Sequence, residues 1–122
     1  AIVALQSGRG GDAPTRMFQG ESVTQIMGAF PFWFSPRFGA EESSVEQHQL
    51  LALIAPRAVL LAHATRDGWA DPIGARATRD AAAPVYAMMG AEPPQQFMRG
   101  GGHGIHRSDW DATLNFLDAR MR

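Results

Sequence analysis

The stretch that decides the fold is AVLLAHATRDGWADP, residues 58–72. Its first seven residues are apolar except for His63, and an uninterrupted apolar run of this length is typical of a parallel strand covered on both faces. A polar loop follows and ends at Asp71 and Pro72, residue types that are favoured at the cap and in the first turn of a helix. The sequence therefore predicts a strand, an acidic loop and a helix in direct succession.

Shorter segments of the same kind lie on both sides of this stretch. Residues 2–5 and 95–99 have the composition of short strands, and a helix is expected over residues 45–54. The helix that begins at Pro72 is expected to reach about Gly90. Strands that alternate with helices favour a parallel α/β sheet.

Two helices carry apolar residues at helical spacing, which predicts the faces that they bury. In the helix over residues 45–54 these residues are Val45, Leu50, Leu53 and Ile54. In the last helix they are Trp110, Leu114, Leu117 and Met121. Ser108 and Asp111 have the spacing of a capping pair, so we expect them at the start of this last helix.

The composition excludes several classes of protein. The 122 residues leave room for one domain, and a formal net charge of −1 gives no basic surface for nucleic acid or an anionic membrane. The absence of cysteine excludes disulfides and thiolate metal sites. Because a strand already starts at residue 2 with no leader before it, we expect a single partial domain over residues 1–122, with its N-terminal part missing.

Asp67 and His103 each come directly after a predicted strand. The carboxyl ends of parallel strands meet at one edge of the sheet, where functional groups gather. A serine hydrolase needs an imidazole to take the proton of its nucleophile and a carboxylate to orient that imidazole, and in α/β-hydrolases the acid precedes the histidine. We therefore interpret Asp67 and His103 as a candidate acid and base. The alternative is that Asp67 caps a turn and His103 is a solvated loop histidine.

The other histidines are weaker candidates. His63 is expected in the core and His48 in a structural role on its helix. His103 and His106 have H-x-x-H spacing but lack the intervening glutamate of a zinc-binding helix. We therefore expect no bound metal.

Ser7 precedes the acid and the histidine in the chain, as a nucleophile would. The nucleophile elbow requires G-x-S-x-G with a helix starting at the serine, whereas Ser7 has no glycine two positions before or after it. We therefore interpret Ser7 as a loop serine. Trp69, beside the candidate acid, could stack on a sugar ring or simply plug the end of the sheet.

Six stretches, running in order over nearly the whole chain, carry a family resemblance: QSGRGGDAPTR, FPFWFSPRF, VEQHQLLALIAPR, TRDGWADPIG, VYAMMG and RGGGHGIHRSDW. Together they resemble the C-terminal half of glucuronoyl esterases, also called 4-O-methyl-glucuronoyl methylesterases. The resemblance implies the C-terminal part of an α/β-hydrolase sandwich, a parallel sheet flanked by helices, with the N-terminal strands and nucleophile elbow missing. It also implies a Ser-His-acid triad that cleaves the ester between glucuronic acid on xylan and lignin alcohols, without a metal or cofactor.

The resemblance assigns roles to individual residues. His103 matches the triad base, and Trp69 matches a sugar-contacting aromatic residue. Many members place their acid where this chain has Gln6, which cannot act as a carboxylate, so the acid is assigned to Asp67 as in other members. Glu21 and Gln25 are candidate counterparts of sugar-binding polar residues. The family's serine elbow and its substrate-binding lysine match nothing in these residues.

The leading hypothesis is the C-terminal part of a serine carbohydrate esterase that acts on glucuronoxylan or lignin-carbohydrate esters, with no nucleic-acid or membrane partner. The family's polymeric substrate implies a secreted or periplasmic bacterial protein. One alternative is an acetyl-xylan or other small-acyl esterase of the same fold. Another is an inactive truncated piece that self-associates through an uncovered sheet edge, and the last is a carbohydrate-binding piece.

Overall fold

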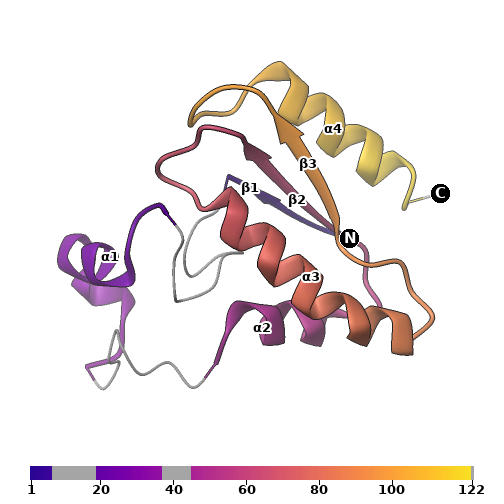
Figure 1. The fold of residues 1–122 in the computed structure, drawn as a ribbon, viewed down its shortest axis with the longest axis horizontal. Helices are drawn as coiled ribbons and strands as arrows, with labels where there is room; N and C mark the ends of the chain where they lie inside the picture. The colour runs from indigo at the N-terminus through magenta and orange to yellow at the C-terminus, as the bar shows by residue number, and fades with distance from the viewer. Residues whose placement is uncertain (7–18, 37–44, 122) are drawn as a thin grey trace.

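The computed structural model describes residues 1–6, 19–36 and 45–121. Its three strands form one parallel sheet in the order in which they occur in the chain. They are β1 (Ile2–Leu5), β2 (Val59–Ala64) and β3 (Gln95–Arg99). The loops that follow β2 and β3 therefore emerge at one edge of the sheet (Figure 1), as the sequence predicts.

Strand β2 is the centre of the sheet. All six of its residues are buried, which is the expected consequence of an apolar run that is covered on both faces. The register pairs Leu61 with Ala4 of β1 on one side and with Gln96 of β3 on the other. Within the described ranges, no strand pairs with the outer edge of β1.

Helices cover both faces of this sheet. They are α1 (Val23–Ala29), the 3-10 helix η1 (Pro31–Trp33), α2 (Gln47–Ile54), α3 (Pro72–Met88) and α4 (Arg107–Asp118). The sheet lies between α3 and α4, α2 packs beside α3, and α1 lies apart from the sheet (Figure 1). A parallel sheet flanked by helices confirms the predicted fold class. None of the helices in the described part of the chain has the length and apolar character needed to cross a bilayer.

The core forms where α2, α3 and β2 meet. It is built from Leu51, Val59, Leu61, Ala82 and Tyr86. The Tyr86 hydroxyl is fully buried and donates toward the carbonyl oxygens of Arg57 and Leu51, at 3.2 and 3.4 Å. Burial raises the pKa of Tyr86, so this hydroxyl keeps its proton and remains a donor.

The start of α4 differs from the prediction. His106 is the cap residue of this helix, and the carboxylate of Asp109 accepts a hydrogen bond from the His106 N–H at 2.7 Å. The predicted capping pair of Ser108 and Asp111 is therefore wrong. The physical reason is Arg99, the last residue of β3. Its guanidinium donates to the same Asp109 carboxylate, which sets Asp109 at the third position of the helix and makes His106 the cap.

The predicted buried face of α4 is also wrong. Trp110, Leu114 and Met121 are each more than half exposed and Leu117 is only partly buried, whereas the buried residues are Asp109, Thr113 and Phe116. Because Asp109 must point inward to reach Arg99, the helix is rotated about its axis and the apolar stripe faces outward. The prediction for the helix before β2 holds only for Ile54, which packs against the core, whereas Val45, Leu50 and Leu53 are exposed and α2 buries Leu51 instead.

Leu61→Ala tests whether β2 is the centre of the core. Leu61 is only 1% exposed, so the cavity left by this change should lower the free energy of unfolding by about 2–5 kcal/mol. Leu61→Met keeps the volume and should cost less than about 1.5 kcal/mol. Urea titrations of the two variants measure this, and equal losses would contradict the assignment.

Candidate active site

Asp67 lies in the loop directly after β2 and is fully buried. The loop turns back on the strand, since the Asp67 N–H donates to the carbonyl oxygen of Ala64 at 3.2 Å. The Oδ1 atom then accepts hydrogen bonds from the backbone N–H groups of Trp69 and Ala70, each at 3.0 Å. The local sequence therefore folds around the carboxylate and presents backbone donors to it.

These contacts keep the Asp67 carboxylate ionised. Burial by itself raises the pKa of this group. The hydrogen bonds from Ala70 N–H, from His103 and from Trp69 N–H, together with the attraction of the imidazole, outweigh burial and hold the pKa below its ordinary value. Asp67 therefore carries a negative charge across the neutral pH range.

His103 is brought to this carboxylate from the loop after β3. Its Nδ1 atom lies 2.9 Å from Oδ2 and 3.0 Å from Oδ1 of Asp67. An ionised carboxylate can only accept, so Nδ1 carries the proton and, in the neutral ring, Nε2 has a free lone pair. The His103 side chain is 51% exposed, which makes the ring accessible from solvent. An accessible imidazole oriented by a buried carboxylate is the arrangement that general-base catalysis requires.

Arg99, the last residue of β3, anchors the loop that follows it, residues 100–106, which we call the histidine loop. Its guanidinium donates to the carbonyl oxygens of Gly100, Gly102 and Gly104, the Gly100 and Gly102 contacts at 3.0 Å. Gly101 and Gly104 have positive φ angles of 105° and 126°, which non-glycine residues rarely adopt, so the glycines allow this carbonyl-inward turn. The loop therefore wraps around one buried side chain.

Arg99 is itself neutralised by Asp109. The Arg99 Nε atom donates to Oδ2 of Asp109 at 2.8 Å, and both side chains are almost completely buried. The same carboxylate oxygen accepts from His106 N–H, which ties the end of the histidine loop to the first turn of α4. The buried pair thus fixes both the loop that carries His103 and the helix that follows it.

The candidate substrate-binding residues lie on segments that meet at Trp69. The side chain of Trp69 is 64% exposed, while its carbonyl oxygen accepts from Glu21 N–H at 3.1 Å. A Cβ at Gly20 would lie only 2.9 Å from that carbonyl oxygen, so a glycine is needed for this close approach. The Gln25 side-chain oxygen accepts from Ser22 N–H at 2.7 Å, which gives it a capping role at the start of α1.

The remaining sequence candidates do not join this site. His63 is fully buried in β2, as expected for a core residue, and His48 is half-buried on α2. His106 is the exposed cap of α4, and the described residues contain no group of three or more histidine, aspartate or glutamate side chains that could hold a metal. Ser7 lies outside the described residues.

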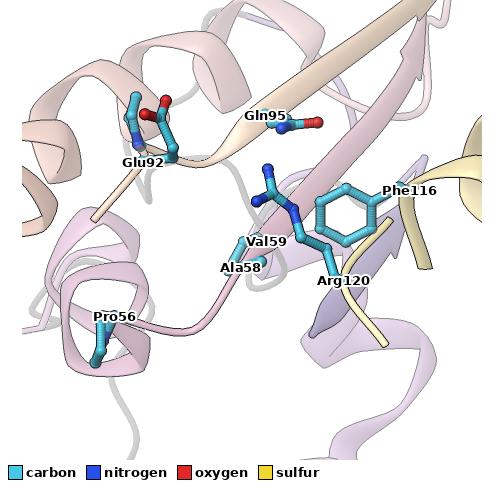
Figure 2. Close-up of a pocket in the computed structure, with 8 residues that line it drawn as sticks. Pro56, Ala58, Val59, Glu92, Gln95, Phe116 and Arg120 are labelled. Carbon is cyan, nitrogen blue, oxygen red and sulfur yellow. The ribbon is translucent and has the colours of Figure 1, made fainter. Parts of the chain in front are cut away.

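A small hollow lies at the opposite end of the sheet, where β2 and β3 begin (Figure 2). It is lined by Val59 and Gln95 at the strand starts, by Phe116 of α4 and by Arg120, which follows that helix. The guanidinium carbon of Arg120 lies 5.9 Å from the centre of the Phe116 ring. Because this hollow is at the amino ends of the strands, it is separate from Asp67 and His103.

Sequence reasoning selected Asp67 and His103, which the structure brings into contact, but missed the residues that hold their loops. Arg99 directly precedes the glycines before His103, and Asp109 follows them in the next helix. An arginine at a strand end, ahead of a glycine-rich loop with an aspartate ten residues later, is the signal that could have identified the pair.

Comparison with known proteins matches residues 2–90 to a family model described as glucuronyl esterase, fungi. Carbohydrate esterase MZ0003, from an unknown prokaryotic organism, is 37% identical, with 94% of this chain and 32% of that protein covered. The 4-O-methyl-glucuronoyl methylesterase 1 of Phanerochaete chrysosporium is 31% identical, with 83% of this chain and 24% of that protein covered.

Among solved structures, a promiscuous CE15 esterase from a marine bacterial metagenome superposes with a TM-score of 0.86 at 36% sequence identity. This match covers 99% of the present chain and 36% of that one. The chain therefore spans between 24% and 36% of the length of these three proteins.

The lowered pKa of Asp67 predicts a specific pH dependence of stability. The unfolded state binds the Asp67 proton more readily, so the stabilisation is complete above its unfolded pKa and is lost as pH falls below about 4 through the folded pKa. The free energy of unfolding of wild type minus that of Asp67→Asn should shrink between pH 5 and pH 2. Urea titrations at each pH measure it, and a constant difference would contradict the assignment.

Arg99 and Asp109 should behave as one unit. Arg99→Met leaves a buried carboxylate without its cation and should lower the free energy of unfolding by about 3–5 kcal/mol. The double variant Arg99→Met, Asp109→Leu removes both charges and should recover most of this loss. A double-mutant cycle from chemical denaturation measures the coupling, and simply additive losses would show that the pair does not act together.

Proposed function

The chain belongs to the glucuronyl esterase family, and from this premise we propose that its residues supply the acid and the base of a serine esterase. The observation that supports this is the contact of His103 Nδ1 with the Asp67 carboxylate at 2.9 Å. It lies at the carboxyl ends of the strands, where catalytic groups of parallel α/β sheets are found.

In the proposed reaction, His103 acts through Nε2. This atom takes the proton of a serine hydroxyl as the serine oxygen attacks the ester carbonyl carbon, and it returns the proton to the departing alcohol. Water then attacks the acyl-enzyme with His103 again as base, which releases the free acid and the serine. Asp67 keeps its negative charge throughout and stabilises the imidazolium that forms at each step.

The proposed nucleophile is a serine outside these 122 residues. The G-x-S-x-G pattern of a nucleophile elbow does not occur in the sequence. The chain also spans only 24–36% of the length of the relatives described above, which leaves ample chain for the elbow in proteins of this family. Ser7 remains a loop serine in this proposal.

The proposed substrate is an ester of 4-O-methyl-glucuronic acid, as carried by glucuronoxylan where it is joined to lignin. The name of the Phanerochaete chrysosporium relative states this acyl group. The exposed Trp69 beside the acid loop offers a flat apolar surface for the sugar ring, and Glu21 is placed next to it by its bond to the Trp69 carbonyl. Gln25 is the weaker candidate, because its side-chain oxygen caps α1. Such a polymer does not enter cells, so we propose action outside the cytoplasm.

A broader acyl specificity is the second candidate function. It is favoured by the solved structure at 36% identity, whose protein is described as a promiscuous esterase. The same Asp67 and His103 would serve an acetyl ester, and only the contacts to the uronate would differ.

Hydrolysis of a methyl ester of glucuronic acid by the intact protein tests the proposal. Asp67→Asn and His103→Ala should each lower kcat by roughly 10⁴-fold, because the base is either misoriented or absent. His106→Gln is the matched control on the same loop and should leave kcat within about twofold of wild type. Equal activity of His103→Ala and wild type would contradict the proposed base.

Two further readouts separate the competing hypotheses. Faster turnover of acetylated xylan than of the glucuronate ester would favour the small-acyl esterase. Absence of turnover in all variants, together with concentration-dependent sedimentation, would favour an inactive piece that associates through the outer edge of β1.

A further inference from the structure

Gln6 occupies an unusual position at the end of β1. It has a φ angle of +49°, in the left-handed region that residues other than glycine rarely adopt, and it is only 8% exposed. Its backbone N–H donates to the carbonyl oxygen of Ala62 at 2.7 Å, which locks it to the neighbouring strand β2. A buried polar side chain in this conformation persists where specific contacts hold it.

Within the described ranges, the hydrogen bonds of the Gln6 side chain are with Gly104 of the histidine loop. Its Oε1 atom accepts from Gly104 N–H at 2.9 Å, and its Nε2 atom donates to the Gly104 carbonyl oxygen. A primary amide has a donor and an acceptor side by side, which an ionised carboxylate or an aliphatic side chain does not have. The side chain therefore hydrogen-bonds both the N–H and the carbonyl oxygen of Gly104, which directly follows His103.

The contact of Gln6 with Gly104 reaches across the sheet. β1 and β3 are separated by β2, so the contact from Gln6 to the loop after β3 passes over the end of β2, where Asp67 lies. Arg99 donates to the same Gly104 carbonyl oxygen from the β3 side. Gly104 is thus bound by Gln6 and by Arg99, which lie on either side of the loop that carries Asp67. These hydrogen bonds keep His103 beside Asp67.

We propose that Gln6 is a positioning residue that sets His103 on Asp67 by fixing the Gly104 peptide groups. The His103 ring is half exposed, so packing alone does not orient it, and the backbone that carries it must be anchored. A displacement of about 1 Å in a catalytic group can cost roughly 10²-fold in rate. The consequence for catalysis rests on the proposed function, whereas the consequence for the contact of His103 with Asp67 does not.

Two substitutions of Gln6 in the intact protein separate positioning from a general structural role. Gln6→Leu removes the donor and the acceptor. Gln6→Met keeps the approximate length and volume of the side chain but also lacks the amide donor and acceptor. Because leucine and methionine are close in volume, the two variants should fold equally well and should both lose the contact with Gly104.

The first readout is the hydrogen-bonded Nδ1 proton of His103, observed by NMR in protein labelled with ¹⁵N-histidine and without substrate. This signal should be lost in both Gln6→Leu and Gln6→Met. The second readout is hydrolysis of the glucuronate methyl ester, in which Gln6→Leu should lower kcat by roughly 10- to 100-fold with KM within about twofold. Gln95→Leu makes the same exchange at the far end of the sheet and should change neither.

Two results would overturn the proposal. One is an unchanged Nδ1 proton signal in Gln6→Leu. The other is a loss in both Gln6 variants that only follows the fraction of unfolded protein. If the wild-type protein shows no hydrolysis, the proposed function fails, but the NMR readout still decides the role of Gln6.

Discussion

The arrangement of the site depends on one buried guanidinium. A loop rich in glycine has few side chains to pack, and its backbone carbonyl groups would be left without partners as it folds over the sheet. Arg99 supplies donors to three of these groups at once, and Asp109 balances its charge from α4. The shape of the loop, the first turn of α4 and the place of His103 all follow from this contact. Replacing the pair by packed apolar residues can restore stability, but it cannot restore the donors that shape the loop.

Two buried aspartates differ in whether solvent can reach the side chain that each one binds. Asp67 and Asp109 are both fully buried, and each accepts hydrogen bonds from backbone N–H groups or from a cationic partner. Asp109 faces an arginine that is itself buried and always charged, so its charge has no route to solvent or substrate. Asp67 contacts the imidazole of His103, which is half exposed. The same side chain thus serves as a structural counter-ion in α4, whereas in the loop after β2 it contacts an imidazole that solvent can reach.

The strands and the pairing of Asp67 with His103 could be predicted from the sequence because their signals are local. A continuous apolar run specifies β2, and residues that follow parallel strands must meet at one edge. The buried face of α4 could not be predicted, because periodicity takes no account of Arg99, whose need for Asp109 turns the apolar stripe outward. Gln6 was interpreted only as a missing carboxylate. Its amide function became visible when Gly104, far away in the sequence, was placed beside it.

The bond between Gln6 and Gly104 also constrains the order in which the molecule can assemble. It joins residues 98 positions apart, nearly the full span of the chain, and β2 must already lie between them. Contacts of such long range form late, because the entropy of closing the intervening chain must first be offset by more local structure. The turn around Asp67 needs only its own neighbours and can form early. A partly folded or nascent chain therefore holds an acid without its histidine, and the complete pair marks the end of folding.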